Sequence, residues 1–366
     1  MSDPITITTL EVNRGDWSQT RVVEESQGEL NENEVLLKID RQALTANNIS
    51  YATSGDALGY WRFFPAEEGW GRIPAMGWAD VIASKHPEVE VGERVWGFFP
   101  FSTHLKIQAG KAGAASFSDV SPHREGLAPV YAQFDRASAN PIYEAAREDQ
   151  DSLLRGLFMT SWLVEDFLEV NDQFGADACL ITSASSKTSI ALAHCVKQRG
   201  RLESVALTSA RNVAFCESLG CYDRVVTYDA IPGLDASQPA VMVDMAGSSQ
   251  VISDVHHHYG DALKHSCRIG ATHYEEMGPV EGLPGPEPEF FFAPSHLQTR
   301  SKELGAGEFM MRLGAAYVGF RQYCDSWLQV ELSRGAEAVG ETYQQVLAGG
   351  ANPATGQMIA MNGEAP

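Results

Sequence analysis

A run of small and hydroxyl-bearing residues follows the short apolar stretch 178–182 and opens a helical pattern. The run reads Ser183-Ala184-Ser185-Ser186-Lys187-Thr188. The first N–H groups of a helix have no intrahelical acceptor, and the helix dipole is positive at that end, so phosphate groups bind there favourably. Serine hydroxyls can donate to phosphate oxygens, and Lys187 adds positive charge. The run is a candidate phosphate loop of a nucleotide-binding fold; the alternative is a structural turn between a strand and a helix.

The candidate loop departs from the usual glycine pattern. Dinucleotide folds place three glycines here, which let the pyrophosphate approach the backbone closely. This chain has Ala184, Ser186 and Ser189 at those three positions. The sequence therefore leaves open whether the loop still binds a dinucleotide.

The end of the next strand bears on which dinucleotide would bind. An acidic residue there, roughly twenty residues after the loop, would bind the free 2′-hydroxyl of the ribose. The chain has Ser209 and Arg211 instead. A hydroxyl and a guanidinium suit a 2′-phosphate, so we expect NADP(H) to be preferred over NAD(H). The alternative for Arg211 is a solvated residue at a helix start.

The elements around this loop alternate. Apolar strand patterns and helical patterns follow one another, which predicts a parallel sheet with helices on both faces. The strands are expected at 178–182, 204–208, 224–228 and 240–244, and the helices at 152–168, 189–197 and 212–219. The N-terminal part instead shows short strands punctuated by Gly and Pro, which predicts a small, partly open barrel. Those strands are expected at 5–12, 34–40, 79–84 and 91–97.

The remaining segments complete the domain organisation. Residues 278–288 are rich in Pro, Gly and Glu and are expected to form a surface loop, whereas 290–292 suggest a strand and 295–320 a largely helical region. The tail 327–361 is expected to return to the first domain. A chain of 366 residues is long enough for two domains of common size. We expect domains at 1–145 and 146–322, with 323–366 as the C-terminal return.

Composition limits the partners. The chain is 44% hydrophobic with a formal net charge of -21, a balance that disfavours nucleic acid and anionic membrane surfaces. The sequence has no apolar run long enough to span a bilayer, and its N-terminus lacks a secretory pattern, so we expect a cytoplasmic protein.

The sequence shows no clear metal-binding motif and no motif of the common hydrolase or Walker type. The six cysteines form no C-x-x-C pair, so buried reduced thiols are expected and no metal site. Consecutive helical residues point about 100° apart, so His256-His257-His258 cannot converge on one ion and are expected at a solvated helix end. The sequence contains no Gly-x-Ser-x-Gly elbow and no Walker loop.

Several of these segments resemble a known superfamily. Residues 208–211, 218–220 and 225–228 resemble the second βαβ unit of quinone reductases in the medium-chain dehydrogenase/reductase superfamily. Residues 243–247 resemble their fourth strand, which adds Ala246 and Gly247 as expected cofactor contacts, and 331–361 resemble their C-terminal return. Gly71–Trp78 and Thr160–Leu163 are similar to a family of that group known only as a domain of unknown function. The resemblance implies an α/β protein with a GroES-like β-barrel catalytic domain and a Rossmann doubly wound parallel-sheet domain.

The resemblance also implies an activity. Zinc-binding members have an early cysteine, a Gly-His-Glu element and a four-cysteine lobe, which this sequence lacks. It is therefore more similar to the zinc-free reductases, which transfer a hydride from NADPH to an activated C=C or C=O of an enone, quinone or enoyl substrate. Relatives are often homodimers, so a homodimer is expected. The alternative, suggested by the missing glycines, is a protein that lost redox activity, either a non-redox lyase or isomerase or a nucleotide-sensing module.

The expected catalytic residues also follow from resemblance. Asn47-Asn48-Ile49-Ser50-Tyr51, followed by Gly55, resembles the segment that places a tyrosine beside the nicotinamide in quinone and enoyl reductases. This implies Tyr51 as donor to the charge that develops on the substrate, with Asn48 as a second catalytic candidate and Asn47 orienting the substrate. The alternatives are that Tyr51 is a packed barrel residue and that the asparagines cap a turn.

Aromatic residues are dense just after this segment. Trp61, Phe64 and Trp78 are candidates to line a pocket for a small hydrophobic substrate. The equal alternative is a loop packed on the barrel. Arg72 could bind a carboxylate or phosphate, although a structural ion pair is the favoured interpretation.

Overall fold

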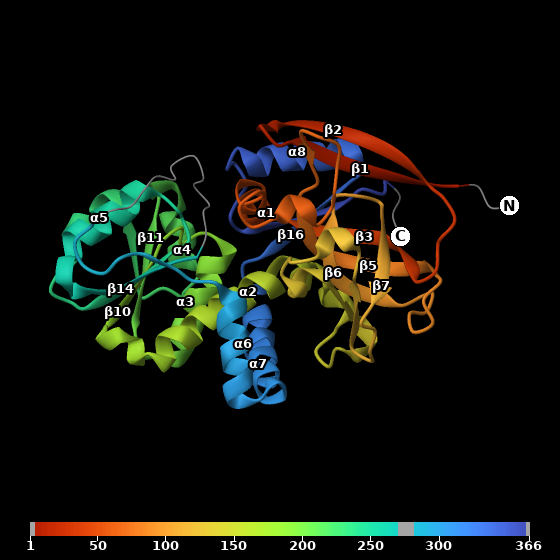
Figure 1. Ribbon diagram of the computed structural model, residues 1–366. Helices are drawn as coiled ribbons and strands as arrows, with labels where there is room; N and C mark the ends of the chain where they lie inside the picture. The colour runs from red at the N-terminus through yellow and green to blue at the C-terminus, as the bar shows by residue number, and fades with distance from the viewer. Residues whose placement is uncertain (1–3, 270–281, 364–366) are drawn as a thin grey trace. The chain divides into compact units, whose positions relative to one another are not determined.

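The chain forms two compact units. The computed structural model describes residues 4–269 and 282–363. Unit 1 comprises Met1–Leu153 with Gln329–Pro366, and unit 2 comprises Leu154–Leu328 (Figure 1). In the described ranges, no helix is both long enough and apolar enough to cross a membrane.

Unit 1 is built on a ring of six antiparallel strands. In ring order they are β3 (Glu34–Leu44), β5 (Pro74–Ser84), β6 (Arg94–Pro100), β9 (Gln133–Arg136), β8 (Ser116–Asp119) and β7 (His104–Gly110). β7 also pairs with β3, so the barrel is closed, whereas the sequence had suggested a partly open one. Its interior is filled by alternating side chains such as Val35, Leu37, Val95 and Phe134. Every second residue of these strands faces inward because the side-chain period of a strand is two.

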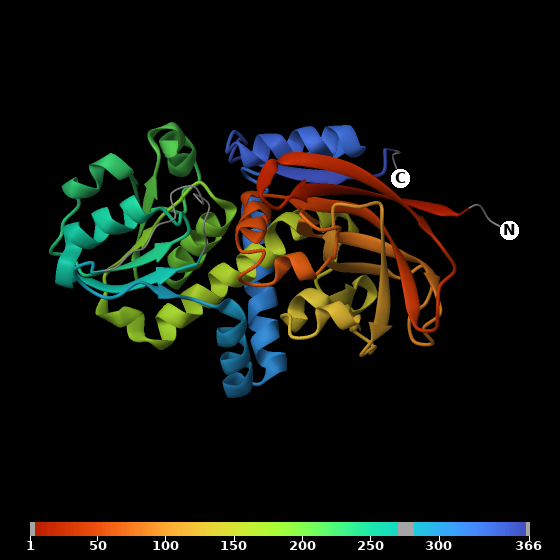
Figure 2. The same cartoon turned by 45° about the horizontal axis from the view of Figure 1, so that its top comes forward.

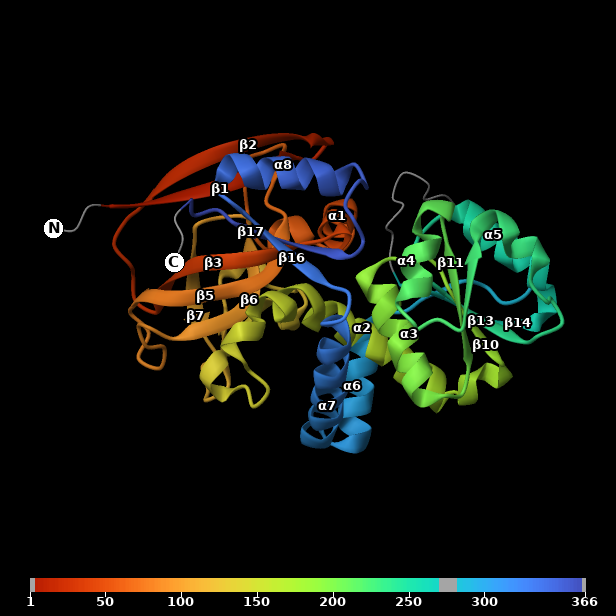
Figure 3. The same cartoon turned by 180° about the vertical axis from the view of Figure 1, so that it is seen from behind.

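The C-terminal segment and the first strands extend this unit. β16 (Gln329–Arg334) and β17 (Thr355–Ala360) continue the sheet from β3, and α8 (Ala336–Leu347) connects them. β1 (Ile5–Asn13), β2 (Asp16–Gln27) and β4 (Trp70–Gly71) form a second sheet. α8 lies along β1 and β2 (Figure 3), where the Tyr343 hydroxyl donates to the carbonyl of Trp17 at 2.9 Å.

Unit 2 contains one six-stranded parallel sheet. Its strands are β10 (Ala178–Ile181), β11 (Glu203–Thr208), β12 (Arg224–Thr227), β13 (Ala240–Asp244), β14 (Leu263–Arg268) and β15 (Glu289–Phe290). They are ordered β12-β11-β10-β13-β14-β15, so the strand order reverses between β10 and β13. This is the order of the doubly wound dinucleotide fold. Helices that include α3 (Lys187–Arg199), α4 (Val213–Ser218) and α5 (Ser249–Tyr259) cover both faces (Figures 1 and 2). The expected fold class, a GroES-like barrel with a Rossmann domain, is confirmed.

Several helical boundaries differ from the expected ones. α2 spans Glu148–Val170, and the expected helix 295–320 is two helices, α6 (Ala293–Leu304) and α7 (Ala306–Cys324). They separate at Gly305, whose φ of 85° is left-handed. Of the expected surface loop 278–288, residues 278–281 lie outside the described residues, and 282–288 form neither helix nor strand.

The histidine run is only partly solvated. His257 is exposed, but His256 is fully buried, so the expectation of a solvated helix end is wrong for His256. Its Nδ1 lies 2.9 Å from the carbonyl oxygen of Pro284 and its Nε2 lies 2.9 Å from Ser266 Oγ. The ring joins α5 to its neighbours. All six cysteines are buried and unpaired, and no three His, Cys, Asp or Glu side chains in the described ranges form a group that could hold a metal ion.

We predict that Gly77→Ala destabilises the barrel. A β-carbon at Gly77 would lie 2.3 Å from the carbonyl oxygen of Arg41 and 2.9 Å from Gln42 Cα, both on the paired strand β3. The backbone cannot move aside as a side chain can, so the free energy of unfolding should fall by about 1–3 kcal/mol. Urea denaturation followed by tryptophan fluorescence measures it. Gly340→Ala is the control, because a β-carbon there meets nothing within 4 Å in α8 and should stabilise by about 0.5–1 kcal/mol. Equal midpoints for Gly77→Ala and the unmodified chain would contradict the account.

Candidate dinucleotide and proton-donor sites

The candidate phosphate loop joins the carboxyl end of β10 to α3. Ser183 has a φ of 49°, a left-handed conformation that glycine adopts far more readily. Its backbone N–H donates to the Tyr228 hydroxyl at 3.1 Å. The carbonyl of Ala184 accepts from the Tyr222 hydroxyl at 2.8 Å. Tyr222 and Tyr228, on either side of β12, therefore stabilise a loop conformation that glycine would adopt without such support.

The serines of the loop cap α3. Ser186 is the N-cap residue, and its Oγ accepts from the backbone N–H of Ser189 at 3.2 Å. Ser189 Oγ donates to the carbonyl of Thr182 at 2.8 Å, and the Ser189 side chain is fully buried. Ser186 and Ser189 thus stand where glycines would have no side chain, and their hydroxyls form hydrogen bonds within the turn.

Lys187 and Thr188 form the first residues of α3. Both are partly buried. Burial lowers the pKa of Lys187 to about 8, so its ammonium is mostly charged at neutral pH and loses the charge as the pH rises through that value. The Thr188 carbonyl accepts from Ser161 Oγ at 2.7 Å, which ties the helix start to α2.

The end of β11 is linked to the loop. A short 3-10 helix, η7 (Ala210–Asn212), follows this strand. Asn212 Nδ2 donates to Ser185 Oγ at 2.9 Å and to Ser209 Oγ at 3.2 Å. The Arg211 side chain is exposed. The structure thus brings Ser185 and Ser209 together through Asn212, a residue that the sequence analysis did not single out.

A buried carboxylate fixes the point where the strand order reverses. Asp244, fully buried at the end of β13, accepts from Thr182 Oγ1 at 2.7 Å. Its other bonds come from the backbone N–H groups of Ala246 at 3.2 Å and Gly247 at 3.0 Å. Burial raises the pKa of Asp244, and these hydrogen bonds oppose the shift. Ala246 and Gly247 therefore lie next to the candidate phosphate loop. Sequence reasoning missed Asp244, although an acidic residue after four apolar ones was a usable signal.

In unit 1, a short helix positions Tyr51. This helix, α1 (Ala46–Thr53), begins after Thr45, whose backbone N–H donates to Asn48 Oδ1 at 2.7 Å. Asn48 Nδ2 donates to the carbonyl of Pro74 at 2.7 Å. Asn48 is buried and anchors the helix to β5, so it positions Tyr51. Burial raises the pKa of Tyr51, and the nearby Asn47 side chain opposes that shift.

Tyr51, Tyr60 and Tyr131 form a group that we call the tyrosine cluster. The ring centroids of Tyr51 and Tyr60 are 4.6 Å apart, and that of Tyr131 lies 6.3 Å and 5.8 Å from them. The Tyr60 hydroxyl donates to the Tyr131 hydroxyl at 3.5 Å, and the Tyr51 and Tyr131 rings pack edge to face. Burial raises the pKa of all three phenols, so they are protonated at neutral pH.

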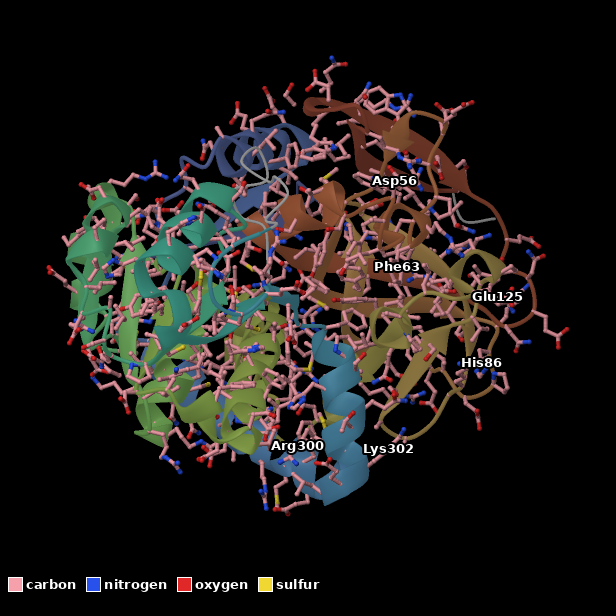
Figure 4. The ribbon with its side chains drawn as sticks, turned by 60° about the vertical axis from the view of Figure 1, so that its left-hand side comes forward. Asp56, Phe63, His86, Glu125, Arg300 and Lys302 are labelled. Carbon is pink, nitrogen blue, oxygen red and sulfur yellow. The ribbon has the colours of Figure 1, made fainter. Side chains whose placement is uncertain are left out.

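Of the three aromatic residues predicted to line the pocket, only Phe64 packs beside the tyrosine cluster. Phe64 is buried in the same apolar cluster as Tyr60 and Phe63, against which Tyr51 and Tyr131 pack. Figure 4 labels Phe63 on its segment of unit 1.

The other two aromatic residues lie elsewhere. Trp61 packs so tightly on two glycines that a β-carbon at Gly55 would lie 2.1 Å from its Nε1. Trp78 is 1% exposed and donates to the carbonyl of Glu148 at 3.0 Å. Arg72 pairs with Glu11 at 2.8 Å and Glu25 at 2.6 Å, a structural ion pair.

Solved structures with the same fold are medium-chain reductases. An enoyl thioester reductase from Candida tropicalis, in a mutant form, matches 97% of this chain and 100% of its own at 14% identity with a TM-score of 0.56. CurA from Vibrio vulnificus in complex with NADPH matches 98% and 100% at 12% identity with a TM-score of 0.62. A complex of Etr1p with NADP and crotonyl-CoA matches 97% and 100% at 14% identity with a TM-score of 0.57. The chain therefore has the fold of the medium-chain dehydrogenase/reductase superfamily.

The sequence places the chain more narrowly. It belongs to the family described as Protein of unknown function (DUF2855), whose model matches residues 42–352. A search of curated proteins by sequence finds no match.

We predict that Thr182→Val weakens the junction of β10 and β13. Valine has the same shape but no hydroxyl, so the Asp244 carboxylate and the backbone N–H of Met245, 2.9 Å from Thr182 Oγ1, lose a buried partner. The free energy of unfolding should fall by about 1–3 kcal/mol. In Thr182→Ser, which keeps the hydroxyl, the free energy of unfolding should fall less, by about 1 kcal/mol. Urea denaturation measures both. Equal losses would show that the methyl group, not the hydrogen bond, matters.

Proposed function

We propose that this protein is an NADPH-dependent, zinc-independent reductase of an activated C=C or C=O in a small hydrophobic enone, quinone or enoyl-type substrate. The observation that carries the proposal is the hydrogen-bonded tyrosine cluster in the barrel unit. It adjoins buried aromatic side chains, where a developing negative charge on a substrate gains most from a fixed donor. The fold supports this, because solved members hold NADP or NADPH.

The residues of unit 2 fit a dinucleotide. The α3 N-terminus with Lys187 would hold the pyrophosphate, and Ser209 with Arg211 would hold the 2′-phosphate of NADPH. Ser248, next to Gly247, adds a further contact. Its Oγ is buried and has no hydrogen-bond partner in the described part of the chain, which a ligand hydroxyl would supply.

The barrel residues would complete the reaction. When bound, NADPH supplies the hydride. Reduction of an enone then places negative charge on the substrate oxygen and α-carbon, and a proton must follow. The tyrosine cluster supplies that proton, and its raised pKa values keep the phenols protonated until charge develops. Asn48 and Asn47 hold Tyr51 in place for this step.

One observation favours a second candidate function. The Ser183 amide, which a phosphate would use in a glycine-type loop, already donates to Tyr228. A chain with this loop could have kept the fold and lost redox activity, as a lyase, an isomerase or a nucleotide-sensing module. Absence of dinucleotide binding would favour this second function.

We predict that Arg211→Ala selectively weakens NADPH binding. Loss of a charged partner of the 2′-phosphate should raise the Kd for NADPH about tenfold and leave the Kd for NADH unchanged. Titration followed by nicotinamide fluorescence measures both constants. Arg201→Ala is the matched control, because Arg201 is exposed near the opposite end of β11 and pairs with Asp172. If both variants lose affinity for NADPH equally, Arg211 does not bind the 2′-phosphate.

We predict that Tyr51→Phe slows turnover without weakening cofactor binding. Removal of one hydroxyl from the cluster should lower kcat at least about tenfold and change the Kd for NADPH less than about twofold. Oxidation of NADPH with a panel of enones and quinones measures kcat. Tyr259→Phe is the control, since the buried Tyr259 hydroxyl has no hydrogen-bond partner among the described residues. Unchanged turnover in Tyr51→Phe would remove Tyr51 from the mechanism.

A further inference from the structure

We propose that the outer face of helix α7 is the surface through which two copies of this chain associate, with their α7 helices antiparallel. A homodimer is expected from the resemblance to medium-chain reductases, and α7 supplies the face. α7 spans Ala306–Cys324 and lies beside α6 as a helical hairpin of unit 2 (Figures 1 and 3). This surface contains none of the candidate cofactor or proton-donor residues, so association does not depend on the proposed reductase activity.

The inner face of α7 is fixed by aromatic packing against α2. Phe309, Tyr317 and Phe320 are buried along one side of the helix. The ring centroid of Phe309 lies 5.2 Å from that of Trp162, and the ring centroid of Phe320 lies 5.1 Å from that of Phe158. These contacts determine the rotation of α7 about its own axis, so the opposite face points away from α2.

The opposite face of α7 is apolar and built largely of small residues. Gly307, Met311 and Ala315 follow one another in steps of four residues, which places them on one side of the helix. All three are exposed, and Met311 is 63% exposed. An exposed apolar face of this kind is typical of an interaction surface. We call it the outer strip, and helical spacing assigns the following residues to it: Gly307, Met311, Gly314, Ala315, Val318 and Gln322.

The glycines of the outer strip favour a second helix as the partner. Glycine is less favourable than alanine inside a helix, and a β-carbon at Gly307 would meet nothing within 4 Å, so packing within the chain does not require glycine there. The distance between two packed helices depends on the side chains at their contact, and small residues let the helices approach closely. The strip therefore suits close packing of one helix on another.

The outer strip is also symmetric about its centre. Gly314 and Ala315 lie in the middle, and Met311 and Val318 lie at equal spacing on either side. A two-fold axis at this centre places Met311 of each copy against Val318 of the other, while the small residues allow close approach between them. A face that complements itself in this way is what a two-fold dimer requires.

Charge favours a second copy over a charged partner. The formal net charge of the chain is -21, so two copies repel each other over most of their surfaces. The outer strip contains no charged residue, and the adjacent Glu308 pairs with Arg312 at 2.7 Å. A basic partner gains nothing from an uncharged strip. Two acidic copies therefore meet here with little direct repulsion.

The area of the outer strip sets the expected strength of the dimer. α7 has 19 residues, which at about 1.5 Å per residue gives a helix roughly 28 Å long. A face about 10 Å wide buries roughly 300 Å² per copy, compared with about 800 Å² per partner in a standard interface. The dimer should therefore be weak, with a Kd on the order of 10–100 µM.

The first test is sedimentation equilibrium of the full chain over a range of concentrations. The average mass should rise from monomer to dimer with a Kd of about 10–100 µM. The Kd should fall at least about threefold between about 0.1 M and 1 M NaCl, because salt screens the repulsion between two acidic copies. A monomer at every concentration would overturn the proposal, and so would a dimer that weakens as salt is added.

The second test uses variants of the outer strip. Met311→Glu places a carboxylate in the contact, and Ala315→Leu adds bulk where the helices approach most closely. Each should raise the Kd at least about tenfold. Leucine is a good helix former, so the Ala315→Leu monomer should stay folded. Val91→Glu is the matched control, because Val91 is also 63% exposed but lies in unit 1, and its Kd should change less than about twofold.

Other occupants of the outer strip give different results. A dimer that persists in both strip variants uses another face and contradicts the proposal. A chain that stays monomeric but floats with phosphatidylcholine vesicles, and no longer does so as Met311→Glu, would assign the strip to a lipid surface instead. Dimerisation without reduction of any enone or quinone would leave this proposal standing while the proposed function fails.

Discussion

The hydrogen bond between Thr182 and Asp244 is the contact on which the arrangement of unit 2 depends. It joins the ends of β10 and β13 at the position where the strand order reverses. A buried carboxylate is unfavourable unless it is hydrogen-bonded, and Asp244 meets that requirement with one hydroxyl and two backbone amides. The same bonds set the path of the chain into α3 and into α5.

The loop shows how hydrogen bonds can replace conformational freedom. A non-glycine residue in the left-handed region costs on the order of 1–2 kcal/mol. Ser183 accepts that conformation because Tyr228 holds its amide and Tyr222 holds the following carbonyl. The hydroxyls of Ser186 and Ser189 complete the helix cap. The loop therefore reaches a defined shape without glycine.

Much of the fold was predictable because its signals are local. The strands of unit 2 are short apolar runs bounded by polar residues, and α2 has a clear helical period. α1 was missed because residues 46–53 have little apolar periodicity; the helix depends on the cap from Asn48 and on Pro74, a distant partner. His256 was placed wrongly because its burial depends on Pro284 and Ser266. Tyr131 could not be inferred, since only the folded barrel brings it to Tyr51.

Hydrogen–deuterium exchange with and without saturating NADPH is the most direct test of the central claim, that the glycine-free loop binds NADPH. The account predicts slower amide exchange in residues 183–189, 209–212 and 245–249, with little change in β16 or α8. These segments contain the α3 N-terminus, the end of β11 and the loop after β13. Unchanged exchange in all three at millimolar NADPH would contradict the account and leave a Rossmann fold without a dinucleotide.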